Sequence, residues 1–362
     1  MKNCVILAGL SLWMSLVTCT TNNTRSVKIG DNPFENLSEY GFFQGVLGDL
    51  IPTEGVLPYD LNSPLFSDYA HKGRFVWMPA GVSANFTTEH VFDFPKGTVL
   101  IKNFYYTNDE RSSTSGRRII ETRLLIHREA EWEALSYVWN KEQTDAIYDK
   151  VGDIVQVSWI DHGGQKRDVN YIIPNKNQCK TCHGYKGALM PIGPKVANLN
   201  KDFRYTDGVA NQLVKWSNNG YLSWLNIRYE DLPRAAVWDD SLHYSLDQRA
   251  MSYLDINCGH CHNAYGAANT SGLTLTIDAQ KNDNIGIYKP TVSAGAGTGG
   301  HTYSIVPGHP ETSVMVYRMA SIEPGAMMPE LGKTVVHQEG VKLISDWIRE
   351  MKATEYDTKS LQ

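Results

Sequence analysis

Two five-residue motifs constrain this chain more than any other part of its sequence. The first spans 179–183 and reads CKTCH, and the second spans 258–262 and reads CGHCH. Each motif places two thiols three positions apart and an imidazole directly after the second thiol. Side chains of this chemistry, this close together, typically bind a metal, either directly as zinc ligands or as the attachment point of a haem. The fold therefore has to accommodate a metal or a cofactor at two places.

The number of cysteines argues against a disulfide framework. The chain has six cysteines. Cys4 and Cys19 lie in the N-terminal segment, and the other four make up the two motifs with none left over. Two disulfides are the usual interpretation of four cysteines in an exported protein, but a disulfide closed within C-x-x-C is strained and redox-active. Redox-active disulfides are therefore only a minor alternative.

The histidine that follows each pair favours haem over zinc. With 11 histidines in 362 residues, finding one at both positions by chance has odds of roughly one in a thousand. C-x-x-C-H is the attachment signature of c-type haem, in which the thiols form thioethers and the imidazole binds the iron. We predict two covalently bound haem c groups, with zinc as the main alternative. The predicted attachment residues are Cys179, Cys182, Cys258 and Cys261, and the predicted iron ligands are His183 and His262.

The first 19 residues have the layout of an export signal. Lys2 is followed by an apolar run over 5–17 that is too short to span a bilayer. The segment ends in LVTC, which resembles a bacterial lipobox in which Cys19 would become the lipid-modified first residue. Ordinary cleavage to a soluble periplasmic product is the alternative, because Thr18 is less usual there than Gly, Ala or Ser. We predict a periplasmic or outer-membrane-anchored protein, with 20–29 as a polar tether.

Composition limits the class of partner. The formal charge of −5 and the pI near 6.1 give no reason to expect nucleic acid as a partner. Hydrophobic residues make up 42% of the chain, which is enough to form buried cores. No apolar run after residue 19 is long enough for a membrane-spanning helix. The only membrane contact predicted is therefore a lipid anchor at Cys19.

Strand patterns dominate the first half of the chain. Segments 97–107, 118–127 and 134–140 are rich in β-branched and aromatic residues and are separated by short polar breaks. Apolar residues then alternate on both arms of 154–174, across the turn at Gly163-Gly164, which predicts a hairpin. The first motif follows this hairpin directly. We therefore predict a β-rich domain over 30–205 that carries one haem motif.

Helical patterns dominate the second half. A helical connector is predicted over 206–240. Ser245 and Gln248 form a capping-box pattern for a helix that runs into the second motif, and 337–352 carries an amphipathic pattern. These two helices predict an all-α cytochrome c-like domain over 241–353, followed by a tail at 354–362. The predicted fold class is α+β, with a β-rich N-terminal domain and this all-α domain.

A second axial ligand can be proposed for only one of the two irons. Met328 lies in a loop bounded by Pro and Gly before the last helix, where a small cytochrome c carries its methionine ligand. It is preferred to Met327 because it precedes a proline. For the first haem the sequence leaves the choice open. The candidates are Met190, His71, His127 and His162, and His260 is predicted to be a solvent-facing spacer.

Several longer stretches carry a resemblance to a family. They are PLFSDYAHKGRFVWMP, ETRLLIH, YVWNKEQTDA, NQCKTCH, PIGPKVANLN, INCGHCH, GIYKPTVSAGAGTGG, IVPGHPETSVMVYRM and MMPELG. Across about residues 35–350, the sequence resembles a little-characterised family of bacterial di-haem c-type cytochromes. The resemblance implies two covalent haems, a β-rich N-terminal half and a C-terminal cytochrome c domain with Met328 as an axial ligand. It implies no substrate.

The predicted function is electron transfer. An exported di-haem c-type cytochrome would pass single electrons between redox protein partners in the periplasm or at the cell surface. An oxidoreductase enzyme of peroxidase type, with an open iron at the first haem, is the alternative within haem chemistry. A zinc-binding structural lipoprotein is the alternative outside it.

Overall fold

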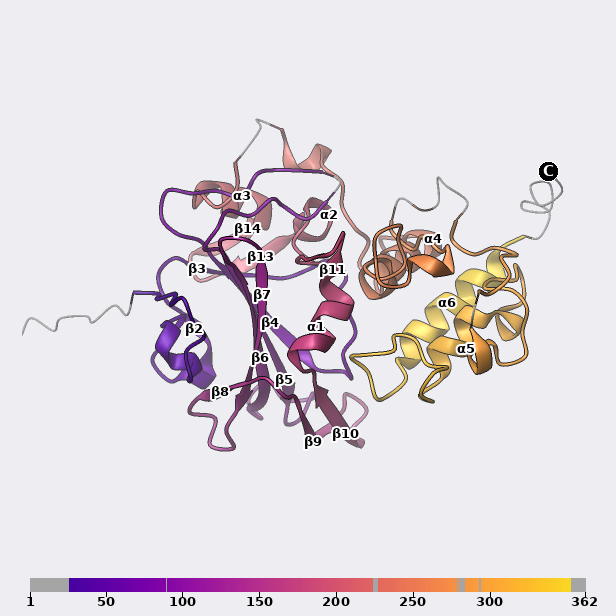
Figure 1. Ribbon diagram of the computed structural model, residues 1–362, viewed down its shortest axis with the longest axis horizontal. Helices are drawn as coiled ribbons and strands as arrows, with labels where there is room; N and C mark the ends of the chain where they lie inside the picture. Colours follow the sequence, from indigo (N-terminus) through magenta and orange to yellow (C-terminus); the bar gives the residue numbers. More distant parts are fainter. Residues whose placement is uncertain are drawn as a thin grey trace, which may run out of the picture.

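A β-rich body and a smaller helical part make up the protein (Figure 1). The computed structural model describes residues 26–352 apart from 89, 224–226, 278, 280–283 and 293. The predicted export signal, Cys19, the first part of the tether and the tail at 354–362 lie outside these residues. Strands account for 27% of the chain and helices for 23%. Within the described part, no helix is long and apolar enough to cross a membrane.

The body is built on a six-stranded antiparallel sheet in which each strand pairs with the next along the chain. Its strands are β3 (Val56–Tyr59), β4 (His71–Trp77), β5 (Val99–Thr107), β6 (Arg117–His127), β7 (Trp132–Trp139) and β8 (Ala146–Asp149). Strands β5, β6 and β7 confirm the three strongest strand predictions. Their β-branched and aromatic residues suit a sheet that is covered on both faces.

The two faces of this sheet pack against different cores. Phe75, Ile101 and Leu124 are paired across β4, β5 and β6 and belong to the core on one face. The next row, Val76 and Leu100, points the other way and belongs to a second core that includes Trp216. This alternation follows from the two-residue repeat of a strand. The second face is the one that receives the segment carrying the first motif.

A two-stranded hairpin follows the sheet and confirms the hairpin prediction. Its strands are β9 (Asp153–Ile160) and β10 (Lys166–Ile173), and Val157 pairs with Val169. The chain then enters α1 (Lys176–His183), which holds the first motif and packs against β7 (Figure 1). Shorter elements nearby are η1 (Leu37–Tyr40), β1 (Phe43–Gln44), η2 (Leu47–Asp49), β2 (Ile51–Pro52), β11 (Gly184–Tyr185), β12 (Ala188–Leu189), α2 (Val196–Leu199) and β13 (Asp202–Tyr205).

The helical part begins later than predicted and is held together by its own core. In the predicted connector, β14 (Gly208–Asn211) pairs with β13 before α3 (Gln212–Asn218) starts. The longer helices are α4 (Leu246–Leu254), α5 (Val314–Ala320) and α6 (Gln338–Glu350), and a π-helical turn, η4 (Asp255–Gly259), continues α4 into the second motif. Residues of α4, α5 and α6 share one apolar cluster. The remaining short helices are η3 (Tyr229–Asp231), η5 (Asn269–Ser271), η7 (Gly295–Thr298) and η8 (Pro310–Thr312).

The predicted fold class is wrong, because the protein is β-rich and no all-α cytochrome c domain is evident among the described residues. The described residues of 260–313 contain no α-helix; they form turns, short 3₁₀ segments and the isolated bridges Ile287–Ile305 and Pro290–Tyr303. The physical reason lies in the glycines of this stretch. Gly272 and Gly286 have φ angles of 63° and 105°, in the left-handed region that helices avoid. The prediction extended two correctly placed helices over a segment that turns repeatedly.

Candidate metal centre

The two C-x-x-C-H motifs meet in space although they lie far apart in the sequence. The Sγ atoms of Cys182 and Cys261 and a ring nitrogen of His260 all lie within 4.8 Å of one another. The Cys261 thiol also lies 3.8 Å from the backbone oxygen of Thr181. A single cluster of two thiols and one imidazole thus joins the end of α1 to the residues after η4. Nothing in the sequence predicted this meeting.

Local sequence explains how each motif is positioned. Asn175 caps α1 by accepting a hydrogen bond from the Gln178 N–H at 2.9 Å, and Ser245 caps α4 in the same way from Gln248 at 3.2 Å. Both caps are capping boxes, as predicted for α4. Gly259 fits where a larger residue would not, since a Cβ there would lie 2.9 Å from the Leu275 oxygen. The spacer between the second pair of cysteines is therefore fixed by packing.

The histidine that ends each motif has one nitrogen engaged and one free of hydrogen bonds. Nδ1 of His183 lies 2.8 Å from the Met190 oxygen, and Nδ1 of His262 lies 3.0 Å from Ser271 Oγ. Neither Nε2 forms a hydrogen bond with a described residue. Burial lowers the pKa of each ring to about 4, so both are neutral at pH 7. This is the arrangement of a metal-binding histidine, whose second nitrogen is oriented by an outer partner.

The four motif thiols are unpaired by disulfides and differ in their surroundings. All four are free cysteines. Burial raises the pKa of Cys258 to about 12. The hydrogen bond between the Cys182 and Cys261 thiols lowers the pKa of Cys182 and raises the pKa of Cys261. Cys182 is therefore the thiol of this pair that loses its proton first.

His260 does not behave as the predicted solvent-facing spacer. Its Nδ1 atom is buried and has no hydrogen-bond partner in the described structure. A buried polar atom without a partner is rare in folded proteins and points to a missing ligand. The prediction failed because the segment that covers this ring comes from the first motif.

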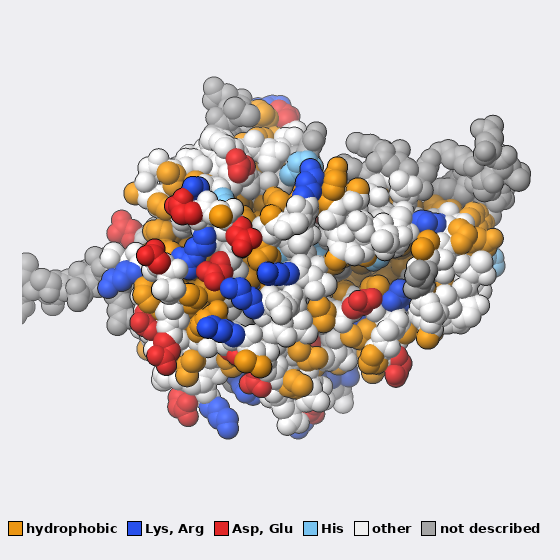
Figure 2. Space-filling model, in the orientation of Figure 1, with side chains coloured by type: hydrophobic (Ala, Val, Ile, Leu, Met, Phe, Trp, Pro, Cys, Tyr) orange, Lys and Arg blue, Asp and Glu red, His pale blue; other side chains and the backbone are white. Residues whose placement is uncertain are grey.

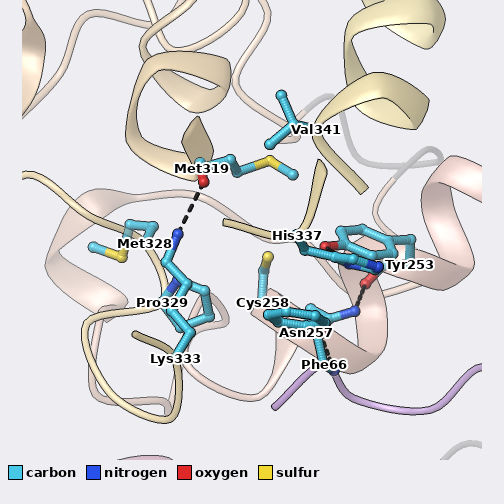
Figure 3. Close-up of a pocket in the computed structure, with 10 residues that line it drawn as sticks. All are labelled: Phe66, Tyr253, Asn257, Cys258, Met319, Met328, Pro329, Lys333, His337 and Val341. Atoms are coloured by element: carbon cyan, nitrogen blue, oxygen red, sulfur yellow. Dashed lines mark hydrogen bonds between the residues drawn. The ribbon is translucent and has the colours of Figure 1, made fainter. Parts of the chain in front are cut away.

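A pocket opens beside Cys258 at the second motif (Figure 3). The Cys258 sulfur points into it, with Met319, Met328 and His337 around it. Its cavity volume is about 30 Å³. The lining residues are Phe66, Tyr253, Asn257, Cys258, Met319, Met328, Pro329, Lys333, His337 and Val341. Met328 is thus placed where a side chain can approach a group attached to Cys258, while Met327 is not among the lining residues.

His337 anchors one wall of this pocket and was not singled out by its sequence. Its ring stacks on Phe66, with ring centroids 4.1 Å apart and planes inclined by 10°. Its Nδ1 lies 2.9 Å from the Tyr253 hydroxyl. Phe66 comes from the β-rich body, whereas His337 and Tyr253 come from the helical part. Only the folded arrangement brings these three rings together.

The other candidate ligands for the first iron lie apart from the cluster. His71 lies 2.7 Å from Glu110, and His162 lies 3.8 Å from the same carboxylate. His127 contacts the Phe94 oxygen and stacks on Trp132. Met190 offers its backbone oxygen to His183 itself, so its backbone lies on the same side as that ring. The second ligand of the first iron therefore stays unassigned.

Comparisons with protein-family models, with curated proteins and with solved structures found no match. The resemblance to di-haem cytochromes stays a prediction that rests on the sequence stretches that carry it.

Proposed function

We propose that this protein is a di-haem c-type cytochrome that passes single electrons between redox proteins outside the cytoplasm. The observation that carries the proposal is the same at both motifs. Two reduced thiols precede a histidine whose Nδ1 contacts an outer partner and whose Nε2 forms no hydrogen bond with a described residue. Covalent haem attachment needs this set of groups in this order.

The residues present fit two haem groups. Cys179 and Cys182 would hold one group, with His183 on its iron, and Cys258 and Cys261 would hold the other, with His262 and Met328 on its iron. When bound, haem supplies a reversible one-electron couple. The apolar walls at Phe66, Met319 and Val341 would exclude water from the second group.

The meeting of the motifs supports a relay. Cys182 and Cys261 lie side by side, so groups attached to them would be neighbours. Neighbouring redox groups can exchange electrons without a mobile carrier. An export signal and a lipid anchor at Cys19 belong to the same proposal, because thioether attachment of haem takes place outside the cytoplasm.

A zinc site is the second candidate, and one observation favours it. Cys182, Cys261 and His260 already lie close enough to share one ion. Zinc binds two thiolates and an imidazole readily, but a closed structural site needs a fourth ligand. In this alternative the protein would be a structural lipoprotein with one metal.

A haem count separates the two candidates. The full chain would be exported from a host with cytochrome c maturation machinery and assayed by pyridine haemochrome and by metal analysis. We expect two covalent haems per chain. Replacing Cys179 and Cys182 by Ser should leave one, and so should replacing Cys258 and Cys261, so each double variant is the control for the other. Zinc without covalent haem would overturn the proposal.

A further inference from the structure

Four basic side chains lie together on one face of the central sheet. Arg74 on β4 is paired with Lys102 on β5, and Lys102 is paired with Arg123 on β6. Lys72 lies two residues before Arg74, so it points to the same face. We call these four residues the basic row. Like charges directly opposite each other on neighbouring strands destabilise a sheet, so their presence needs an explanation.

The acidic residues around the basic row do not balance it. Arg74 pairs with Asp60 at 2.7 Å, and Arg123 pairs with Glu121 at 2.5 Å. Asp60 is shared with Lys201, which lies 3.1 Å from it. Nearby Asp68 accepts hydrogen bonds from the backbone of Thr334 and Val335. Basic side chains therefore outnumber acidic ones at this place on the sheet.

Three donors of the basic row have no polar partner within the described ranges. Lys72 and Lys102 form no hydrogen bond and no ion pair there, and the contact that Lys102 does make is with the Phe104 ring, at 4.7 Å. Arg74 is only 5% exposed, yet its Nη2 atom is buried without a hydrogen bond. Burial lowers the pKa of Lys72 to about 7 and lowers the pKa of Lys102 well below its ordinary value. A buried arginine donor without a partner, beside two part-buried lysines that have no polar partner among the described residues, indicates a missing anion.

The basic row faces the first motif. It shares its side of the sheet with Val76 and Leu100, which belong to the core against which Cys179 packs. Figure 2 shows charged side chains gathered over the β-rich body and fewer over the helical part. An anion at the row would therefore lie next to whatever the first motif holds.

We propose that the basic row binds the carboxylates of a ligand that lies against the first motif. Arginine presents a planar fork that matches a carboxylate, and the two lysines add point charges beside it. Two sources have this chemistry: the propionates of a haem on Cys179 and Cys182, or a small free dicarboxylate. The first source rests on the proposed function, and the second does not.

The test replaces Lys102 by Met, which removes the charge and keeps most of the side-chain length. Lys166→Met is the matched control, because its side chain is on strand β10 and is 70% exposed. The full, haem-loaded chain would be studied by resonance Raman spectroscopy of the propionate bending modes. Succinate binding would be measured by titration calorimetry at constant ionic strength. If Lys102→Met does not fold, Lys72→Met takes its place.

Each outcome supports or overturns the proposal. A propionate band that shifts in Lys102→Met but not in the control supports haem carboxylates as the ligand. Succinate binding that falls by about tenfold in Lys102→Met supports a free dicarboxylate. No band shift and no succinate binding overturn the proposal. If the chain carries no covalent haem, the proposed function fails, and succinate binding alone decides for or against the basic row.

Discussion

The two motif-bearing helices differ in how the protein holds them. Helix α1 has no fully buried residue. It follows the β9–β10 hairpin and lies against strand β7 of the sheet. Helix α4 buries five residues, 250–254, and shares a core with α6. The first motif is therefore attached to the surface of a rigid sheet, whereas the second is part of a core.

This difference suggests different roles for the surroundings of each motif. At the first motif, charge dominates, because the basic row of the sheet faces it. At the second motif, aromatic and thioether side chains dominate, and they come from both parts of the protein. Potential at a haem depends on charge and on ligand type, so two such environments would give two unequal potentials.

The largest loss of stability is expected when the ion pair between the β-rich body and the helical part is broken. Lys195, in the β-rich body, lies 2.5 Å from Asp255 at the start of η4, and their side chains are 18% and 5% exposed. Lys195→Met would leave a buried carboxylate without its partner. We expect the free energy of unfolding to fall by about 3–5 kcal/mol, measured by urea denaturation.

Two variants control this measurement. Lys215→Met breaks a pair whose aspartate is 66% exposed, and it should lower the free energy of unfolding far less than Lys195→Met does. Adding Asp255→Asn to Lys195→Met should restore part of the loss, because the buried charge is then removed. A loss below about 1 kcal/mol in Lys195→Met would mean that the two environments are held together by other contacts.

A smaller change in the free energy of unfolding is expected from His337 as the pH falls. Burial lowers the pKa of this ring from 6.5 to about 4. Between these values the unfolded chain binds a proton that the folded chain does not, so stability is lost as pH falls from about 6.5 to about 4. We expect this ring to account for about 1–3 kcal/mol of that loss, and His337→Gln to remove its share from the slope of stability against pH.

Tyr253→Phe is the matched control for this pH dependence. The substitution removes the hydrogen bond to His337 Nδ1 but leaves the His337 ring stacked on Phe66. The slope of stability against pH should therefore survive in Tyr253→Phe while absolute stability falls. An equal slope in wild type and His337→Gln would assign the pH dependence to other groups.

The parts of the fold that could be predicted are those that depend on short stretches of sequence. Strands β5, β6 and β7, the β9–β10 hairpin and the Ser245–Gln248 cap follow from patterns of a few residues. The prediction of an all-α domain was wrong because it was extended from two helices to the glycine-containing segment between them. Local patterns report on local structure, and they fail where turns are set by packing.

The sequence indicated which residues belong to the candidate site but not what surrounds them. The motif cysteines and histidines can be picked out by their C-x-x-C-H spacing alone. The contact between Cys182 and Cys261, the ring of His337 and the basic row depend on residues brought together by the tertiary fold. In the row, the register of three strands places Arg74, Lys102 and Arg123 opposite one another. Single-sequence reasoning has no access to that register.

The smallest loss of stability is expected at the two helix caps. Removing each cap shows how differently the protein holds α1 and α4. Ser245→Ala and Asn175→Ala each remove a side-chain acceptor from a capping box. Because α4 is part of a core, Ser245→Ala should lower the global free energy of unfolding by about 1 kcal/mol. Because no residue of α1 is fully buried, its loosening is local, and Asn175→Ala should change global stability by less than about 0.5 kcal/mol.

Hydrogen exchange distinguishes local from global loosening in this pair of variants. In Asn175→Ala, amides of α1 should exchange faster while those of α4 and α6 keep their wild-type rates. In Ser245→Ala, amides throughout the core shared by α4 and α6 should exchange faster together. Equal losses of global stability in the two variants would show that α1 unfolds with the whole protein. The first motif would then be as firmly built into the fold as the second, despite its exposed helix.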